Sequence, residues 1–96
     1  MSNLEQKASI IIPFFNEQST LEESVTRLIN EDFKKEILLI NDGSTDKSKE
    51  IGQWLSTKFN NVELINNAKN NGKGFAVRKG IEIATGDVIG IYDADL

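Results

Sequence analysis

The chain has 96 residues, of which 39% are hydrophobic and 27% charged, so it makes at most one ordinary globular domain. It contains no cysteine and no histidine, which excludes disulfides, zinc fingers and nucleophilic sites built on Ser-His or Cys-His pairs. Its net charge of −4 argues against broad, non-specific nucleic-acid binding, so no nucleic-acid partner is expected.

Four short apolar runs predict β-strands, at residues 9–15, 36–41, 62–66 and 87–92. None approaches the roughly 18–20 residues that cross a bilayer, and the polar N-terminus lacks the apolar core of a signal peptide. Nearly continuous apolarity is typical of strands covered on both faces in a parallel sheet. The run at 62–66 is the weakest and is expected at a sheet edge.

Three amphipathic segments between these runs predict helices around residues 21–29, 46–58 and 73–86. Ser19 and Glu22 have capping-box spacing, and Gly86 is expected to cap the third helix at its C-terminus. The apolar positions expected to face the sheet are Leu21, Val25, Leu28 and Ile29 in the first helix, Ile51, Trp54 and Leu55 in the second, and Val77, Ile81 and Ala84 in the third.

Alternating strands and helices predict an α/β fold, a Rossmann-like arrangement of three layers with three helices. We expect a parallel sheet of four strands in the order 3-2-1-4. With that order, right-handed crossovers place the first two helices on one face and the third on the other. In such a sheet, ligands bind beyond the carboxyl ends of the strands. The residues that follow each strand are therefore the candidates for a functional site.

Polar groups follow the first two strands. Pro13 marks where the first ladder ends, and Asn16 and Glu17 then offer polar groups at the crevice, although a solvated turn explains them equally simply. Asp42 comes one residue after the second apolar run, where its carboxylate can accept a hydrogen bond from a ribose hydroxyl or a base N–H. Capping of the next helix is the alternative role, and we favour it for Asp46.

The third and fourth strands are followed by groups of opposite charge. Four basic and no acidic residues lie between 69 and 81, and Lys73 at the start of a helix either receives an anion or belongs to a solvated basic face. The loop matches neither a Walker A motif nor G-x-G-x-x-G. Asp93-Ala94-Asp95 places two carboxylates together at a strand end, and such oxygen ligands suit Mg²⁺ or Mn²⁺.

Four stretches carry a family resemblance: IIIPFFNE at 10–17, LLINDGSTD at 38–46, NNGKGFAVRKG at 70–80 and ATGDVIGIYDADL at 84–96. In this order and spacing they resemble the nucleotide-binding half of family 2 glycosyltransferases, which have the GT-A fold. They look closest to the dolichyl- and polyprenyl-phosphate sugar synthases. The resemblance covers residues 8–96 and implies that 1–96 form the N-terminal, nucleotide-sugar-binding half of a longer GT-A domain, so that this fragment lacks the acceptor half.

The resemblance also implies roles for individual residues. Phe15 takes a place often held by tyrosine, so a hydroxyl contact is lost there. Asp95 is the more direct metal ligand of the D-x-D motif, and Arg78 shares a motif with Lys73 but receives no role. The residues implied to bind the nucleotide sugar are Pro13, Phe15, Glu17, Ile40, Asp42, Lys73, Asp93 and Ala94, and those implied to bind Mg²⁺ or Mn²⁺ are Asp93 and Asp95.

The implied activity of the full-length protein is inverting transfer of a sugar from a UDP- or GDP-linked donor to an acceptor, which is a polyprenyl phosphate in the matching branch. The catalytic base is expected beyond residue 96, so the fragment alone should be inactive. We expect it in the cytoplasm, or at the cytoplasmic face of a membrane if later segments carry anchors.

Two other functions fit the same residues. A phosphotransferase of the haloacid dehalogenase type also places a D-x-D at a strand end, although usually at the first strand. A nucleotide-binding module without catalysis is the other alternative.

The fourth strand is expected at an open edge of the sheet. Its apolar side chains and unpaired backbone offer a template for another chain. The fragment is therefore expected to self-associate, most simply as a two-fold dimer.

Overall fold

A computed structural model describes residues 6–95 of the chain; Leu96, the last residue of the fourth motif, lies outside this range. Strands and helices alternate along the chain, as the apolar pattern predicts. The elements are β1 (Ala8–Phe14), α1 (Leu21–Ile29), β2 (Lys35–Asp42), α2 (Ser48–Lys58), β3 (Val62–Asn67), α3 (Lys73–Ile83) and β4 (Val88–Ile91).

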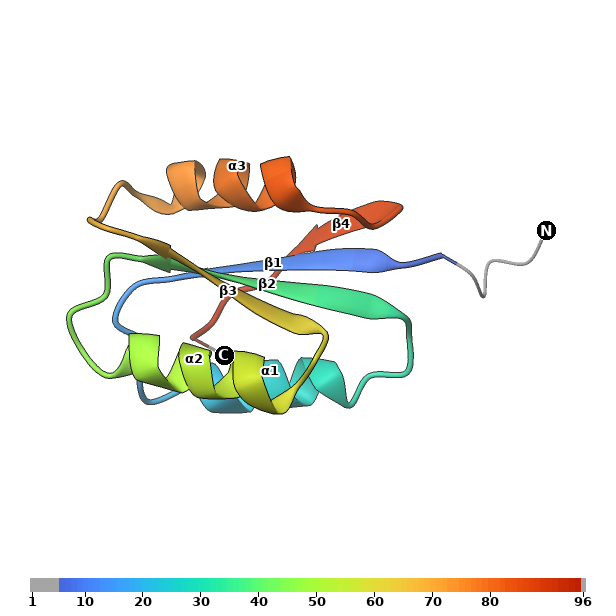
Figure 1. The fold of residues 1–96 in the computed structure, drawn as a ribbon, viewed down its shortest axis with the longest axis horizontal. Coiled ribbons are helices and arrows are strands. Elements are labelled where there is room, and N and C mark those ends of the chain that lie inside the picture. The colour runs from blue at the N-terminus through green and yellow to red at the C-terminus, as the bar shows by residue number, and fades with distance from the viewer. Residues whose placement is uncertain (1–5, 96) are drawn as a thin grey trace.

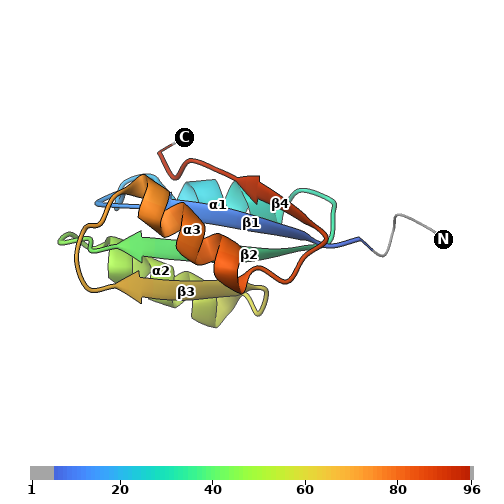
Figure 2. The same ribbon diagram turned by 90° about the horizontal axis from the view of Figure 1, so that it is seen from above.

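The four strands form one parallel sheet in the order β3-β2-β1-β4. Helices α1 and α2 cover one face and α3 covers the other, which gives three layers (Figure 1). Seen from above, α3 runs over the two central strands, with β3 and β4 at the sides (Figure 2). The predicted fold class, strand order and placement of helices are therefore confirmed, as is the edge position of β3.

The core lies on both faces of the central strands, because successive side chains of a strand point to opposite sides. Ile10, Ile12 and Phe14 of β1 are buried with residues of α1 and α2. Ile11, between them in sequence, is buried on the other face with residues of β2 and α3. Within residues 6–95, no helix is both long and apolar enough to cross a membrane.

Helix α2 faces the sheet with smaller residues than expected. Trp54 was predicted to point inward, yet it is 46% exposed, with the Lys58 ammonium 4.8 Å from the centre of its ring. The inner positions include Gly52 and Leu55. A Cβ at Gly52 would lie 3.1 Å from the Leu64 side chain, so the helix packs too closely for a large ring between it and the sheet.

Helix α3 is rotated relative to the predicted stripe. Ile81 was expected to face the sheet, but it is 47% exposed, and the buried residues are Ala76 and Gly80. A Cβ at Gly80 would lie only 2.6 Å from the Ile11 side chain. The absence of a side chain at Gly80 therefore decides which face of α3 approaches β1, and the apolar period alone does not reveal this.

The two predicted helix caps do not form. Thr20, not Ser19, occupies the N-cap position of α1 and makes no side-chain capping bond; its hydroxyl donates to the Ala94 carbonyl oxygen. Helix α3 ends at Ile83 with an extended residue at its C-cap. Gly86 instead allows close passage of β1, since a Cβ there would lie 2.7 Å from the Lys7 carbonyl oxygen.

Pro13 ends the ladder of β1 on one side only, which corrects the simpler prediction. Pairing with β2 continues to Phe14, opposite Asn41, whereas pairing with β4 stops at Ile11. The Ile11 carbonyl faces β4, because it accepts the Tyr92 N–H. Backbone groups two residues apart point to the same side, so Pro13 lacks its N–H on the side where no partner strand remains.

Candidate functional site

A cavity of about 300 Å³ lies at the carboxyl ends of the strands. Residues at or after the carboxyl ends of β1, β2, β3 and β4 contribute to its wall, which is the meeting point expected for a parallel sheet. Its lining includes every predicted site residue except Ile40. The lining residues are Pro13, Phe14, Phe15, Glu17, Asp42, Asn70, Gly72, Lys73, Asp93, Ala94 and Asp95.

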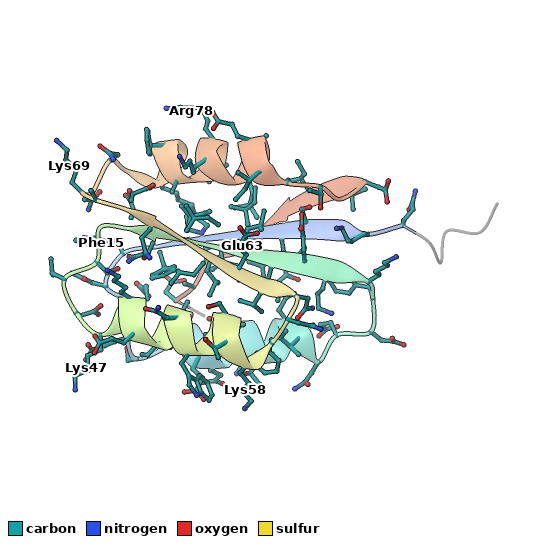
Figure 3. All side chains as sticks on the ribbon, viewed as in Figure 1. Phe15, Lys47, Lys58, Glu63, Lys69 and Arg78 are labelled. Carbon is teal, nitrogen blue, oxygen red and sulfur yellow. The ribbon has the colours of Figure 1, made fainter. Side chains whose placement is uncertain are left out.

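Two residues from the matching motifs lie elsewhere. Ile40 is fully buried and packs with Ile11 and Ala76 beneath α3, so its predicted contact with a nucleotide stays a prediction. Arg78 lies on the outer side of α3 and points away from the sheet (Figure 3). Phe15, by contrast, lies in the loop after β1 and lines the cavity (Figure 3).

Asn16 ties the loop after β1 to the loop after β2. It has a left-handed backbone conformation, with φ of 54°, which asparagine tolerates better than most residues. Its side-chain oxygen accepts the Thr45 N–H at 2.8 Å and the Asp46 N–H at 3.2 Å, while its own N–H donates to the Ser44 hydroxyl at 3.0 Å. Asn16 was expected to offer polar groups to the crevice, but these groups are used to hold the two loops together.

Asp42 organises the turn that precedes α3. It is only 4% exposed, and its carboxylate accepts the Gly72 N–H at 2.8 Å, the Asn71 N–H at 3.1 Å and the Asn67 side-chain amide at 3.4 Å. Gly72 has φ of 95° and ψ of 159°, a conformation essentially restricted to glycine. A carboxylate oxygen has two lone pairs, so the oxygen that accepts the Gly72 N–H can accept a second hydrogen bond from a ligand.

Asp46 was favoured as a helix cap; it precedes Lys47, the N-cap residue of α2, and supports the start of that helix. Its carboxylate accepts the Ser48 N–H at 2.8 Å at the start of α2, and also the Gln18 N–H at 3.2 Å. Burial acts to raise the pKa of Asp46, but hydrogen bonds from Ser48 and Gln18 outweigh it and hold the pKa below its ordinary value. The two aspartates after β2 thus support different loops.

Hydroxyl groups of α1 anchor the D-x-D segment through its central residue. Ala94 is buried, and its carbonyl oxygen accepts the Thr20 hydroxyl at 2.7 Å and the Ser24 hydroxyl at 2.9 Å. The backbone between Asp93 and Asp95 is therefore fixed, while both carboxylates stay exposed at the cavity wall. The spacing of Thr20 and Ser24 puts both hydroxyls on one side of a helix, but nothing in the sequence identifies their partner.

One ion pair crosses the mouth of the cavity. The Lys73 ammonium lies 2.9 Å from an Asp93 carboxylate oxygen, and the two side chains are 63% and 67% exposed. The hydrogen bond to Asp93 raises the pKa of Lys73 above its ordinary value. Among the described lining residues there are four carboxylates, at Glu17, Asp42, Asp93 and Asp95, and one cation, Lys73.

The donor set suits a divalent cation that shares its coordination shell with a ligand. Over residues 6–95, no three acidic residues gather into a cage of protein ligands. Asp93 and Asp95 instead supply exposed carboxylate oxygens on either side of an anchored residue. Mg²⁺ commonly binds in this manner, through one or two carboxylates, water and substrate phosphates, so the residues fit Mg²⁺ or Mn²⁺.

Three lining residues were not among the predicted site residues: Phe14, Asn70 and Gly72. Asn70 and Gly72 precede Lys73 in the same loop. The motif at 70–80 includes them, but it did not identify either one as a site residue. Phe14 lies at the end of β1, where its aromatic side chain belongs mainly to the core.

Comparison with known proteins places this geometry in a family. The model of glycosyl transferase family 2 matches residues 9–96. The chain is 40% identical over 92 residues to a dolichol-phosphate mannosyltransferase of Pyrococcus furiosus, covering 94% of this chain and 26% of that protein. The chain spans about a quarter of the length of that protein and of another curated relative that it matches.

Solved structures share the fold. The mannosyltransferase PcManGT of Pyrobaculum calidifontis, in complex with GDP-Man and Mn²⁺, superposes with a TM-score of 0.87 at 24% identity, over 94% of this chain and 28% of that one. Residues 1–349 of TarS of S. aureus, in complex with UDP-GlcNAc, give a TM-score of 0.84 at 26% identity, over 93% and 26% of the two chains. The strand order, the cavity and the match over 9–96 agree, and the chain belongs to glycosyl transferase family 2.

Proposed function

We propose that residues 1–96 are the N-terminal, nucleotide-sugar-binding half of a glycosyltransferase domain. In the whole protein, this half holds a UDP- or GDP-linked sugar with a divalent metal, and the sugar passes with inversion to an acceptor. The observation that carries the proposal is the convergence of Asp42, Lys73, Asp93 and Asp95 on one cavity at the carboxyl ends of the strands.

The shape of the cavity suggests a placement for the nucleoside. Pro13 and Phe15 form an apolar part of the wall, and the exposed Phe15 ring offers a surface for a base. Asp42 has an unused lone pair beside Gly72 and can accept a hydrogen bond from a base N–H or a ribose hydroxyl. Asp93 and Asp95 line the same cavity, so the phosphates of a nucleotide bound here would be within reach of the D-x-D segment.

Asp93 and Asp95 would hold the metal. A bound Mg²⁺ or Mn²⁺ supplies a positive charge that stabilises the negative charge developing on a nucleoside diphosphate leaving group. The chain itself holds the backbone that carries both carboxylates, because the hydroxyls of Thr20 and Ser24 bind the carbonyl of Ala94. This anchoring reduces the reorganisation that binding requires.

The comparisons support the donor class and suggest an acceptor class. Two structural neighbours were solved with a nucleotide sugar, one with GDP-Man and Mn²⁺ and one with UDP-GlcNAc. A dolichol-phosphate mannosyltransferase among the relatives favours a polyprenyl phosphate as the acceptor and a membrane-associated full-length protein. Membership in family 2 weighs against the dehalogenase-type alternative.

Calorimetric titration tests the binding half of the proposal. UDP and GDP are titrated into the 96-residue chain with and without Mn²⁺, in the wild type and in Asp95→Ala, with Asp32→Ala as a control at an exposed aspartate outside the cavity. We expect weak binding that strengthens with Mn²⁺ in the wild type and the control, and not in Asp95→Ala. Equal binding by Asp95→Ala would show that the D-x-D assignment is wrong.

A nucleotide-binding module without transfer activity is the second candidate for the chain. It predicts the same titration but no sugar transfer by the full-length protein. Incubating the full-length protein with a radiolabelled nucleotide sugar and a polyprenyl phosphate separates the two, because only the transferase moves the label into the lipid phase.

A further inference from the structure

We propose that Lys73 is an exchangeable counter-ion of the D-x-D pair. In the chain without ligand its ammonium pairs with Asp93, and on binding of a metal and a nucleoside diphosphate it leaves Asp93 and contacts the phosphates. The proposal rests on the proposed function, because it assumes that Asp93 and Asp95 receive the metal.

The geometry of the pair allows such an exchange. Lys73 begins α3 and Asp93 follows β4, so their contact at 2.9 Å joins the start of the helix to the segment after the strand at the cavity. Both side chains are mostly exposed, and exposed ion pairs contribute little to stability because water and salt screen them. A lysine has a flexible four-carbon stem and a rotatable point charge, so changing partners requires little reorganisation.

The backbone at both ends of the pair is fixed, so only side chains need to move. The turn before Lys73 is held by the bond from the Gly72 N–H to Asp42, and the residue after Asp93 is held by the hydroxyls of α1. The position of the Lys73 ammonium can therefore change without displacing either strand end. The ammonium stays within reach of the same cavity in both states, since Lys73 lines it.

The charges in the cavity favour exchange on binding. Lys73 is the only cation among the described lining residues, and it partly neutralises four carboxylates. A divalent cation on Asp93 and Asp95 would compete with the ammonium for the same oxygens and repel it. An arriving diphosphate offers new anionic acceptors in the same space, so the ammonium gains a partner as it loses one.

This arrangement predicts effects of opposite sign for one substitution. Lys73→Gln removes the competitor for Asp93, so free Mn²⁺ should bind about two- to fivefold more tightly, which corresponds to the contribution of an exposed ion pair. The same variant lacks the contact to the phosphates, so UDP and GDP should bind roughly tenfold more weakly at saturating Mn²⁺. A lysine whose ammonium stayed away from Asp93 and Asp95 would weaken nucleotide binding when removed and leave Mn²⁺ binding unchanged.

Two titrations on the 96-residue chain test the proposal. Electron paramagnetic resonance measures free Mn²⁺ without nucleotide, and calorimetry then measures UDP and GDP at saturating Mn²⁺. Lys69→Gln is the matched control, because Lys69 lies in the same loop but points away from the protein (Figure 3). It should leave the Mn²⁺ affinity unchanged. Lys73→Arg keeps the charge and should restore most of the nucleotide affinity.

The outcomes separate this proposal from the proposed function. Tighter Mn²⁺ binding together with weaker nucleotide binding in Lys73→Gln supports the exchange. Unchanged or weaker Mn²⁺ binding in Lys73→Gln overturns it, even where the wild type binds nucleotide in a metal-dependent manner. A wild type that binds neither Mn²⁺ nor nucleotide overturns the proposed function, and the exchange with it.

Discussion

Replacing Gly80 by alanine should weaken the packing of α3 on β1. The added Cβ would lie 2.6 Å from Ile11 Cγ2 and 2.9 Å from Ile11 Cδ1, whereas carbon atoms pack at about 3.5–4.0 Å. Ile11 is fully buried and β-branched, so it cannot easily turn aside, and the helix must move by roughly 1 Å. Overpacking of this kind costs about 1–3 kcal/mol.

Gly74 in the same helix provides a matched control. A Cβ there would meet only the Arg78 guanidinium, at 4.0 Å. Both replacements gain up to about 1 kcal/mol of helix propensity, so the difference between the two variants isolates the steric effect. We expect Gly80→Ala to be less stable than Gly74→Ala by about 1–3 kcal/mol.

Urea unfolding followed by circular dichroism measures this difference, provided that the slopes with urea agree between the variants. Equal free energies of unfolding would refute the reasoning, because α3 would then not depend on the close approach of Gly80 to Ile11. Since Lys73 begins α3, a shifted helix should also weaken nucleotide binding in Gly80→Ala and leave it unchanged in Gly74→Ala.

Three further predictions concern other parts of the molecule. Burial acts to raise the pKa of Glu36, but hydrogen bonds from Ser9 and Thr85 outweigh it and lower the pKa below its ordinary value of 4.5. The ionised Glu36 side chain therefore stabilises the fold above pH 4.5, and this stabilisation is lost as the pH falls through the lowered pKa of the folded state. In urea unfolding, the wild type should be more stable than Glu36→Gln at neutral pH but not near pH 3. Asp42→Asn removes a charged acceptor of two backbone N–H groups and should lower the free energy of unfolding by about 1.5–3 kcal/mol; an effect no larger than that of exposed Asp32→Asn would contradict this. The chain should self-associate through β4, where Val88, Ile89 and Ile91 are about half exposed; light scattering that finds only the 10.7 kDa monomer at high concentration would contradict this.

The sequence was sufficient to predict the sheet and the place of the site. Apolar runs marked the strands, and for the expected strand order right-handed crossovers set the face that each helix covers. Once that order holds, the ends of parallel strands lie together, so Asp42, Lys73, Asp93 and Asp95 were expected at one edge and are found around one cavity.

Contacts between distant segments account for what could not be predicted. The rotation of α3 depends on the fit of Gly80 against Ile11, and the exposure of Trp54 follows from the close packing of α2 at Gly52. The anchor of the D-x-D segment joins Ala94 to the hydroxyls of Thr20 and Ser24, which are 74 and 70 residues away along the chain. Local periodicity carries no information about such partners.

The most direct test of the central claim is to locate the metal and the nucleotide by nuclear magnetic resonance. Amide signals of the ¹⁵N-labelled chain are recorded with UDP or GDP as small amounts of Mn²⁺ are added. The account predicts that broadening begins at Asp93, Asp95 and Lys73 and spares Glu36 and Thr85 at the opposite end of the sheet. Broadening that begins at the opposite end, or that is the same in Asp95→Ala, would contradict it.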